Sequence, residues 1–160
     1  MERLWTPWRL QYIAAEKPTG CIFCSALAQH DDRETFIVHR GQHGFVMLNK
    51  FPYNNGHLMV VPYMHTADLS ALDAATQCEL MATMANTMQW LRKASNPEGF
   101  NVGLNLGKAG GAGVADHLHF HVIPRWVGDT NFMTLTGETR VIAEWLDDTW
   151  TRLRAMIESG

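Results

Sequence analysis

The chain has 160 residues, of which 46% are hydrophobic and 18% charged, and its formal net charge is −3. This composition excludes a disordered chain, and the length suits one domain with a sizeable core. The mild acidity argues against a protein that coats nucleic acid, and no apolar run reaches the length of a membrane span. Three cysteines cannot form a disulfide framework, which agrees with a reducing compartment. We therefore expect a cytoplasmic protein without nucleic-acid or membrane partners.

The first third of the chain predicts an arm followed by three strands. The arm, residues 1–20, mixes aromatic and basic side chains and ends at the turn signal Pro18-Thr19-Gly20. The strand candidates are Thr35–His39, Gly44–Asn49 and His57–Pro62. The Asn-Gly pair at positions 55 and 56 favours positive φ, so the last two strands are expected to form an antiparallel hairpin.

A long helix is predicted next. Ser70 and Asp73 have the spacing of a capping box that opens the helix, which runs to about Ala94. Its apolar stripe at helical spacing consists of Leu72, Leu80, Met84, Met88 and Leu91. The segment Asn96-Pro97-Glu98-Gly99 ends the helix. Cys78, within it, is expected to be a packing residue.

Two later segments alternate with the period of a strand. In Phe100–Leu106 the apolar residues are separated by Asn101, Gly103 and Asn105. A loop rich in glycine follows. The segment His117–Pro124 then alternates in the same way, with Leu118, Phe120 and Val122 directed inward and with His117, His119 and His121 on the other face.

The chain ends in an amphipathic helix, predicted from roughly Glu138 to Ile157. The side chains that it directs toward a core are Ile142, Trp145, Leu146, Trp150 and Leu153. The predicted strands follow one another along the chain, the two helices are separate from them, and strands and helices do not alternate as in βαβ units. The fold class is therefore α+β, an antiparallel sheet of about five strands with one long helix and a C-terminal helix, in a single domain over residues 1–160.

The row of histidines predicts chemistry on a phosphate. If the two alternating strands pair, Asn101 and Asn105 join the histidine face, and the glycine loop can aim backbone N–H groups at an anion. Imidazoles, amides and free N–H groups suit a phosphate better than magnesium or calcium. Crowded imidazoles also disfavour one another's protonation, which is useful only where a neutral nitrogen acts as ligand or nucleophile.

Two other interpretations of the row stay open. A lone strand histidine is usually a solvated or hydrogen-bonded residue. A catalytic metal site is also possible, because His-x-His is a common ligand pair. Such sites normally add a carboxylate, and the nearest one, Asp116, points to the opposite face from His117. Metal catalysis is therefore the weaker interpretation.

Cys21-Ile22-Phe23-Cys24 has the spacing of a metal knuckle. One such pair also fits two reduced cysteines in a turn, or a redox dithiol. The absence of a βαβ context argues against the redox interpretation.

Several of these motifs together resemble the histidine-triad (HIT) superfamily. His117-Leu118-His119-Phe120-His121-Val122-Ile123 matches its signature, and Asn55–Pro62 with His65 is similar to its second conserved block. The segments 4–9, 99–107 and 124–133 resemble a narrower bacterial branch that includes diadenosine tetraphosphate phosphorylases. In that comparison the arm 1–20 and the helix segment 138–158 are extensions of the branch.

The resemblance implies an α+β sheet that forms a homodimer and acts on a nucleotide. The middle histidine, His119, is the implied nucleophile on the α-phosphorus. His121 is implied to hold a phosphate oxygen, and His57 to support the triad. The implied substrate contacts are Asn105 and the glycine loop with Gly111 and Gly113, and, in the ribose and base pocket, Phe45, Leu48 and Asn49.

The resemblance also implies which residues would bind a zinc ion together with the cysteine pair. Some triad proteins with this pair bind zinc through the two thiolates, the histidine after the second block and the first triad histidine. The implied structural zinc site is therefore Cys21, Cys24, His65 and His117.

One departure from the family concerns the acceptor. Most family hydrolases have a glutamine about four residues before the first triad histidine, where this chain has Gly113. The implied activity is cleavage at the α-phosphate of a dinucleoside polyphosphate or related conjugate through a nucleotidyl-histidine, with either water or phosphate as acceptor. Phosphate could be held in line with His119 by the glycine-loop amides and Arg125. The alternative function is a nucleotide-binding interaction protein with a slow or silent triad and a structural zinc.

Overall fold

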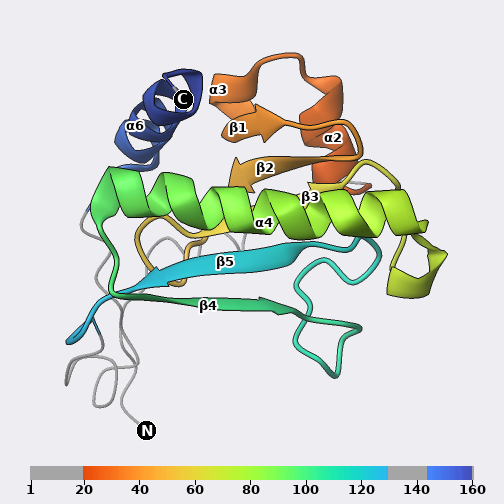
Figure 1. The fold of residues 1–160 in the computed structure, drawn as a ribbon. Helices are drawn as coiled ribbons and strands as arrows, with labels where there is room; N and C mark the ends of the chain where they lie inside the picture. The colour runs from red at the N-terminus through yellow and green to blue at the C-terminus, as the bar shows by residue number, and fades with distance from the viewer. Residues whose placement is uncertain (1–19, 130–143, 160) are drawn as a thin grey trace, which may run out of the picture.

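A five-stranded antiparallel sheet organises the chain (Figure 1). The structure, a computed structural model, describes residues 20–129 and 144–159. The strands lie in the order β1-β2-β3-β5-β4. In chain order the elements are α2 (Ile22–Ala28), α3 (Asp32–Thr35), β1 (Ile37–Arg40), β2 (Gly44–Leu48), β3 (Leu58–Pro62), η1 (Leu69–Ala71), α4 (Ala74–Ser95), β4 (Gly99–Leu104), β5 (Phe120–Arg125) and α6 (Leu146–Glu158). The predicted fold class is confirmed, and the predicted arm 1–20 falls almost wholly outside the described residues.

The two faces of the sheet carry different cores. Strand alternation places Leu58 and its cross-strand partner Val122 on the face that packs against α4. Met59 and its partner His121 lie on the opposite face, beside α2. The larger core therefore closes one face, while the other face buries a smaller apolar cluster next to the histidines.

The helix α4 begins later than the capping-box prediction. Its N-cap is Asp73, whose carboxylate accepts the N–H of Thr76, whereas Ser70 lies in the 3-10 turn η1 and binds Asp68. The prediction therefore misplaced Asp73, which caps the helix rather than lying in its first turn. The predicted end is confirmed, with Asn96 in the left-handed region at φ 46°. Cys78 is exposed on this helix, so the prediction that it packs in the core was wrong.

β4 is an edge strand, and its alternation is weaker than predicted. It pairs with β5, which places Asn101 opposite Ile123 and Gly103 opposite His121, as the sequence predicted. Val102 and Leu106, expected to point into a core, are 46% and 50% exposed. The reason is position: an edge strand has a neighbour on one side only.

Two helices differ from the sequence expectations. The cysteine pair lies at the start of α2, which the sequence did not predict, with Cys21 as its N-cap. α6 begins at Leu146, and the expected start over 138–143 falls outside the described residues. Trp145 precedes the helix and is 82% exposed, so its predicted place in the core was wrong. Among the described residues every helix is too short or too polar to span a bilayer.

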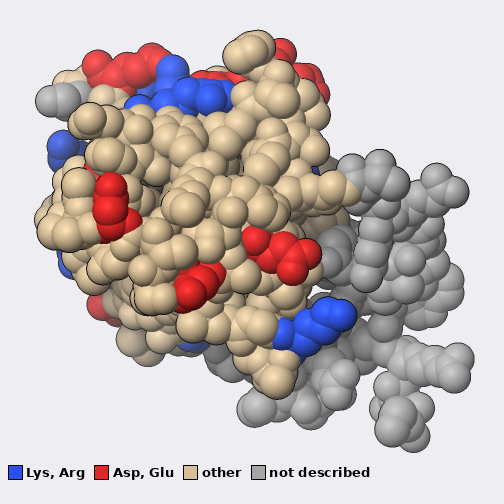
Figure 2. All heavy atoms as spheres, turned by 90° about the vertical axis from the view of Figure 1, so that its right-hand side faces the viewer, with Lys and Arg blue, Asp and Glu red and all other residues tan. Residues whose placement is uncertain are grey.

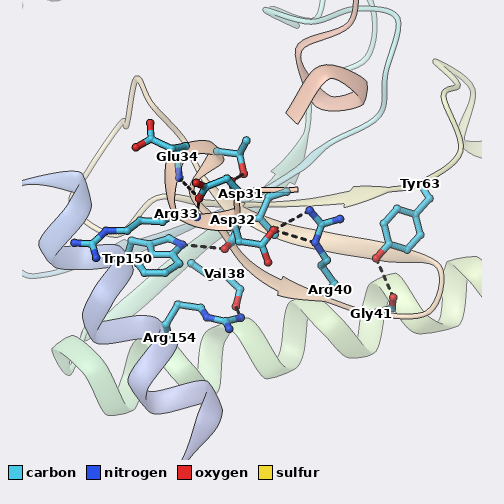
Figure 3. Close-up of polar contacts among 12 residues, drawn as sticks. Asp31, Asp32, Arg33, Glu34, Val38, Arg40, Gly41, Tyr63, Trp150 and Arg154 are labelled. Carbon is cyan, nitrogen blue, oxygen red and sulfur yellow. Dashed lines mark hydrogen bonds and ion pairs between the residues drawn. The ribbon is translucent and has the colours of Figure 1, made fainter. Parts of the chain in front are cut away.

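α6 covers the other edge of the sheet (Figure 3). The Trp150 indole N–H donates to the carbonyl of Ile37 at 2.9 Å, and Arg154 donates to the carbonyl of Val38 at 3.1 Å. The pairing of β1 with β2 is irregular at these residues, so the two carbonyls are available to α6. α6 thus satisfies carbonyls that an uncovered edge would leave to water or to another chain.

Replacing Trp150 with phenylalanine should therefore destabilise the fold. The change keeps an aromatic ring but leaves the Ile37 carbonyl without its donor, which should cost about 1–3 kcal/mol of unfolding free energy. Urea unfolding measures the loss. Trp145→Phe is the matched control, because that side chain is 82% exposed and its replacement should change stability by less than about 0.5 kcal/mol. Equal effects of the two substitutions would contradict the role of the indole.

Candidate active site and metal centre

Four histidines gather along the antiparallel pair β3 and β5: His57 directly precedes β3, His117 and His119 precede β5, and His121 lies within β5. His57 is fully buried, and His117, His119 and His121 are between 1% and 7% exposed. The row that the sequence predicted is therefore enclosed rather than solvated. Figure 2 views the end of the molecule where β5 starts, and there acidic and basic side chains are scattered among neutral ones.

A single hydrogen bond sets the tautomer of His119. Its Nδ1 lies 2.9 Å from the carbonyl oxygen of His117. A carbonyl only accepts, so Nδ1 carries the proton and Nε2 has a free lone pair in the neutral ring. Phe23 packs against the same ring with a centroid separation of 5.0 Å. His119 thus presents an unprotonated, nucleophilic nitrogen.

His57 and His121 form a directed chain. The backbone N–H of Tyr53 donates to Nδ1 of His57 at 3.0 Å, so the proton of His57 must be on Nε2. That Nε2 lies 2.9 Å from Nδ1 of His121 and donates to it. The remaining proton of His121 is then on its Nε2, which is buried and has no hydrogen-bond partner among the described residues. His121 therefore has an unused donor, and its ring is next to that of His119.

Burial keeps these rings neutral. Desolvation, with a smaller contribution from the neighbouring imidazoles, lowers the pKa of His57 to about 3 and that of His121 to about 4. Burial also lowers the pKa of His119, against a smaller opposing effect of its hydrogen bond to His117. The sequence argument named mutual repulsion of the imidazoles, but desolvation is the larger cause.

A hollow of about 170 Å³ opens next to His121. Its walls are Tyr53 from the β2–β3 connection, and Asn101, Val102, Gly103, Asn105, His121 and Ile123 from the β4–β5 side. Asn101 and Asn105 thus join the histidine face, as the strand alternation predicted. The arrangement combines a neutral nucleophile, a free imidazole donor and side-chain amides, which suits attack on an anionic phosphorus centre.

The ligand atoms of Cys21, Cys24, His65 and His117 all lie within 4.8 Å of one another. The Cys21–His117 and Cys24–His65 contacts are 3.2 and 3.4 Å between Sγ and Nδ1. A tetrahedral zinc with ordinary bond lengths separates such atoms by roughly 3.6 Å. Nε2 of His117 donates to the carbonyl of Pro62 at 2.9 Å, which leaves Nδ1 free to face the cluster. The four residues could therefore hold a metal ion, and the donor set fits zinc.

The predicted base and ribose contacts fall in three different places. Leu48 is buried in the α4 core, on the face away from the histidines, so this prediction was wrong. Phe45 is on the histidine side but is fully buried against Tyr63, which leaves no surface for a ligand. Asn49 lies beside His57, with its amide 3.4 Å from Nδ1 of that ring. The alternation of a strand shows which residues share a face, but it does not show which of the two faces a helix will cover.

Arg125 is not beside His119. It lies six residues further along the chain, about 20 Å at the rise of a strand. Its guanidinium forms an ion pair with Asp129 at 2.6 Å and donates to Asn101. The expectation that it holds phosphate in line with His119 was therefore wrong. Gly111 has positive φ, 84°, in the loop before the triad, and Gly113 is exposed there.

Sequence reasoning missed three residues that pack around the histidines or hold the adjoining chain in place. Phe23, between the two cysteines, contacts the rings of both His117 and His119. Tyr53 tilts over His57 and His121 at 4.8 and 5.6 Å between ring centroids. Buried Asn54 donates to the carbonyl of Pro124 and to Asp129. Two features of the sequence could have pointed to these residues: an aromatic residue between the two cysteines, and a run of polar residues directly before His57.

Comparisons with known proteins identify the family of this chain. The model of the HIT domain matches residues 31–127. The chain is 43% identical over 157 residues to a Mycobacterium tuberculosis protein named AP-4-A phosphorylase, covering 93% of this chain and 80% of that protein. A Zn-bound histidine triad family protein from Mycobacterium smegmatis has a TM-score of 0.70 at 25% identity, covering 88% and 94% of the two chains. A hypothetical histidine triad nucleotide-binding protein from Sulfolobus tokodaii has a TM-score of 0.69 at 27% sequence identity. The match covers 87% of this chain and 93% of that chain.

The buried imidazole pair should make stability depend on pH. Both folded-state pKa values lie below the ordinary value of 6.5, so the stabilisation is complete above pH 6.5 and is lost as pH falls toward 4. Between pH 7 and pH 5 each histidine should remove about 2 kcal/mol of unfolding free energy. The His57→Gln variant retains a hydrogen-bond donor and an acceptor but cannot be protonated. Its loss of unfolding free energy between pH 7 and pH 5 should therefore be about 2 kcal/mol smaller than that of the wild type. Urea unfolding at both pH values measures it.

The matched control is His30→Gln, which removes an imidazole from the surface. If the two variants change the pH dependence equally, the buried pair is not its source.

Proposed function

Because this chain belongs to the HIT domain family, we propose that it is an enzyme that transfers a nucleoside monophosphate group from a dinucleoside polyphosphate through a nucleotidyl-His119 intermediate. The 43% identity to a protein named AP-4-A phosphorylase supports this substrate class. The observation that carries the proposal is the tautomer of His119. Its bond to the His117 carbonyl directs an Nε2 lone pair outward, next to the unused Nε2–H of His121.

The first step follows from these two nitrogens. Nε2 of His119 attacks the α-phosphorus, a P–N bond forms, and the bond from phosphorus to the bridging oxygen breaks, so that the polyphosphate leaves with its electron pair. His121 donates its Nε2–H to a non-bridging oxygen and stabilises the charge that develops there. His57 holds His121 in the donating tautomer. Asn105 and the backbone N–H groups of the loop with Gly111 and Gly113 are the further proposed phosphate contacts.

The second step transfers the group to an acceptor. The small residue at Gly113 lacks the amide with which most family hydrolases act on water, and it leaves space beside the phosphorus. We take inorganic phosphate as the acceptor. Its oxygen forms a new P–O bond, the P–N bond breaks with return of the electron pair to His119, and the product is a nucleoside diphosphate.

Zinc is the proposed occupant of the Cys21, Cys24, His65 and His117 cluster. Two thiolates and two imidazoles complete a closed site, so the ion would stabilise the fold rather than take part in the reaction. His117 connects it to the nucleophile, because the same residue supplies the carbonyl that fixes His119.

A homodimer is proposed through β4. α6 covers the β1 edge, whereas β4, at the opposite edge, has Val102 46% exposed. Within residues 20–129 and 144–159 no strand pairs with the outer side of β4, and such an apolar edge favours pairing with a second copy.

The function is tested with diadenosine tetraphosphate. With inorganic phosphate present, the wild-type protein should form ATP and ADP. His119→Ala should lower turnover by roughly 10³-fold or more while nucleotide affinity stays within about tenfold. Product chromatography and a binding titration measure both effects.

Rapid quenching without acid should trap the phosphoramidate on His119 of the wild type. ATP and AMP formed at an equal rate without phosphate would refute the phosphate acceptor alone. Near-normal turnover by His119→Ala would refute the nucleophile, and nucleotide binding without any turnover would favour an interaction protein with a silent triad.

Elemental analysis tests the metal. Protein purified without chelator should contain close to one zinc ion per chain, and Cys24→Ser should lose it and melt at a lower temperature, since the site ties α2 to His117. Cys78→Ser, the same change at an exposed position on α4, should keep the metal. Metal-free wild type with unchanged melting would reject a structural zinc.

Light scattering after gel filtration tests the dimer. The wild type should have twice the chain mass of 18.1 kDa, and Val102→Lys should have the mass of one chain, because a charge at an edge strand opposes pairing. Val127→Lys, at a site 87% exposed beyond β5, is the control. A dimeric Val102→Lys protein would place the interface elsewhere.

A further inference from the structure

We infer that the hollow between Tyr53 and β4 is the subsite for the acceptor, a phosphate-sized oxyanion. This inference rests on the proposed nucleotidyl transfer and adds to it the place and the residues that select the acceptor.

One side chain that lines the hollow carries an unused donor, and the strand opposite it leaves space beside its ring. Nε2 of His121 is buried without a hydrogen-bond partner among the described residues, and His121 lines the hollow. Opposite it, across the strand pair, stands Gly103, where even a Cβ would meet nothing within 4 Å. A side chain at this position would fill the space in front of the imidazole. Because Gly103 has none, an anion in the hollow can lie against the His121 ring.

The size and charge of the hollow indicate its ligand. Its volume of about 170 Å³ is below the roughly 300–1,000 Å³ of sites for larger organic ligands, so it suits a small ion rather than a nucleoside. Its lining residues include two carboxamides and an imidazole but no carboxylate. Donors without a competing negative charge favour an oxyanion.

Arg125 determines which end of Asn101 the anion meets. Nη1 of Arg125 donates to Oδ1 of Asn101 at 2.6 Å. The carboxamide oxygen is therefore engaged, and the amide N–H groups are the polar atoms that Asn101 can offer to the hollow. Arg125 thus acts as a positioning residue, through Asn101, rather than as a direct phosphate ligand.

Asp129 holds the two walls of the hollow together. Its carboxylate accepts two N–H groups of Arg125 at 2.6 Å each and the amide of Asn54 at 2.8 Å. Asn54 is adjacent to Tyr53 on one wall, and Arg125 holds Asn101 on the other. The network is partly buried, so the spacing of the walls is fixed before a ligand arrives.

The position of the hollow agrees with in-line transfer. His119 does not line it, but His121 does, and the ring of His121 is 5.0 Å from that of His119. A phosphorus bound to His119 and held by His121 would therefore present its far side to the hollow. An oxygen of hydrogen phosphate bonds to the phosphorus there, the P–N bond breaks, and its electron pair returns to Nε2; the proton stays on the diphosphate product or passes to water.

The test measures how the intermediate divides between two acceptors. With diadenosine tetraphosphate and inorganic phosphate, ADP reports transfer to phosphate and AMP reports transfer to water. This ratio is set after the intermediate forms, so it does not depend on the rate of the first step. Asn101→Asp keeps an acceptor for Arg125 but adds a negative charge to the hollow, and the ADP to AMP ratio should fall about tenfold or more. Asn101→Ala, which removes the donor without adding charge, should lower it less.

Asn86→Asp is the matched control, because it makes the same chemical change at an exposed position on α4 and should keep the wild-type ratio. An unchanged ratio in both Asn101 variants would overturn the subsite and leave the nucleotidyl transfer standing. Wild type that forms only AMP at saturating phosphate would overturn it as well. Wild type that forms neither the intermediate nor any product would instead refute the proposed function.

Discussion

A buried imidazole can act as a nucleophile only if another group holds its proton on the remote nitrogen. In this protein the carbonyl of His117 does so for His119, and the backbone N–H of Tyr53 sets the opposite orientation for His57 and, through it, for His121. Two neighbouring rings of one residue type thus differ in role, one offering a lone pair and the other a proton. Backbone groups impose this difference, so it depends on the path of the chain around the site.

The rest of the architecture keeps those backbone groups in place. β3 and β5 are neighbours in the middle of the sheet, which brings His57 next to His121 although 64 residues separate them. α2 and its N-cap Cys21 supply both cysteines and Phe23, so one short helix contacts the candidate metal ligands and the ring of His119 together. α6 and β1 lie at the far edge, where side chains of the helix satisfy strand carbonyls.

The misplaced residues have a common physical reason. Trp145 and Val102 were assigned from periodicity, and Leu48 from the part that the early strands play in the resembled family. Neither source reports what covers a given face of an element. Leu48 points to the α4 core, Trp145 stands outside its helix, and Val102 lies on an edge strand. Arg125 shows a related limit. A basic residue after a triad suggests a phosphate ligand, but the strand carries it away from His119 and gives it a carboxylate partner.

The family resemblance supplied His65 and His117 as partners of the cysteine pair. By itself the sequence determined the α+β class, the approximate places of the five strands, the long helix, the histidine face and the spacing of Cys21 and Cys24. These follow from local spacing, because strand and helix periods and short motifs are properties of neighbouring residues. Only the tertiary structure decided which nitrogen of each histidine carries the proton, how fully the rings are buried, and that Tyr53 lines the hollow while its neighbour Asn54 binds Asp129. Those properties depend on contacts between residues far apart in the chain, such as Asn54 with Asp129 across 75 positions, and periodicity contains no information about them.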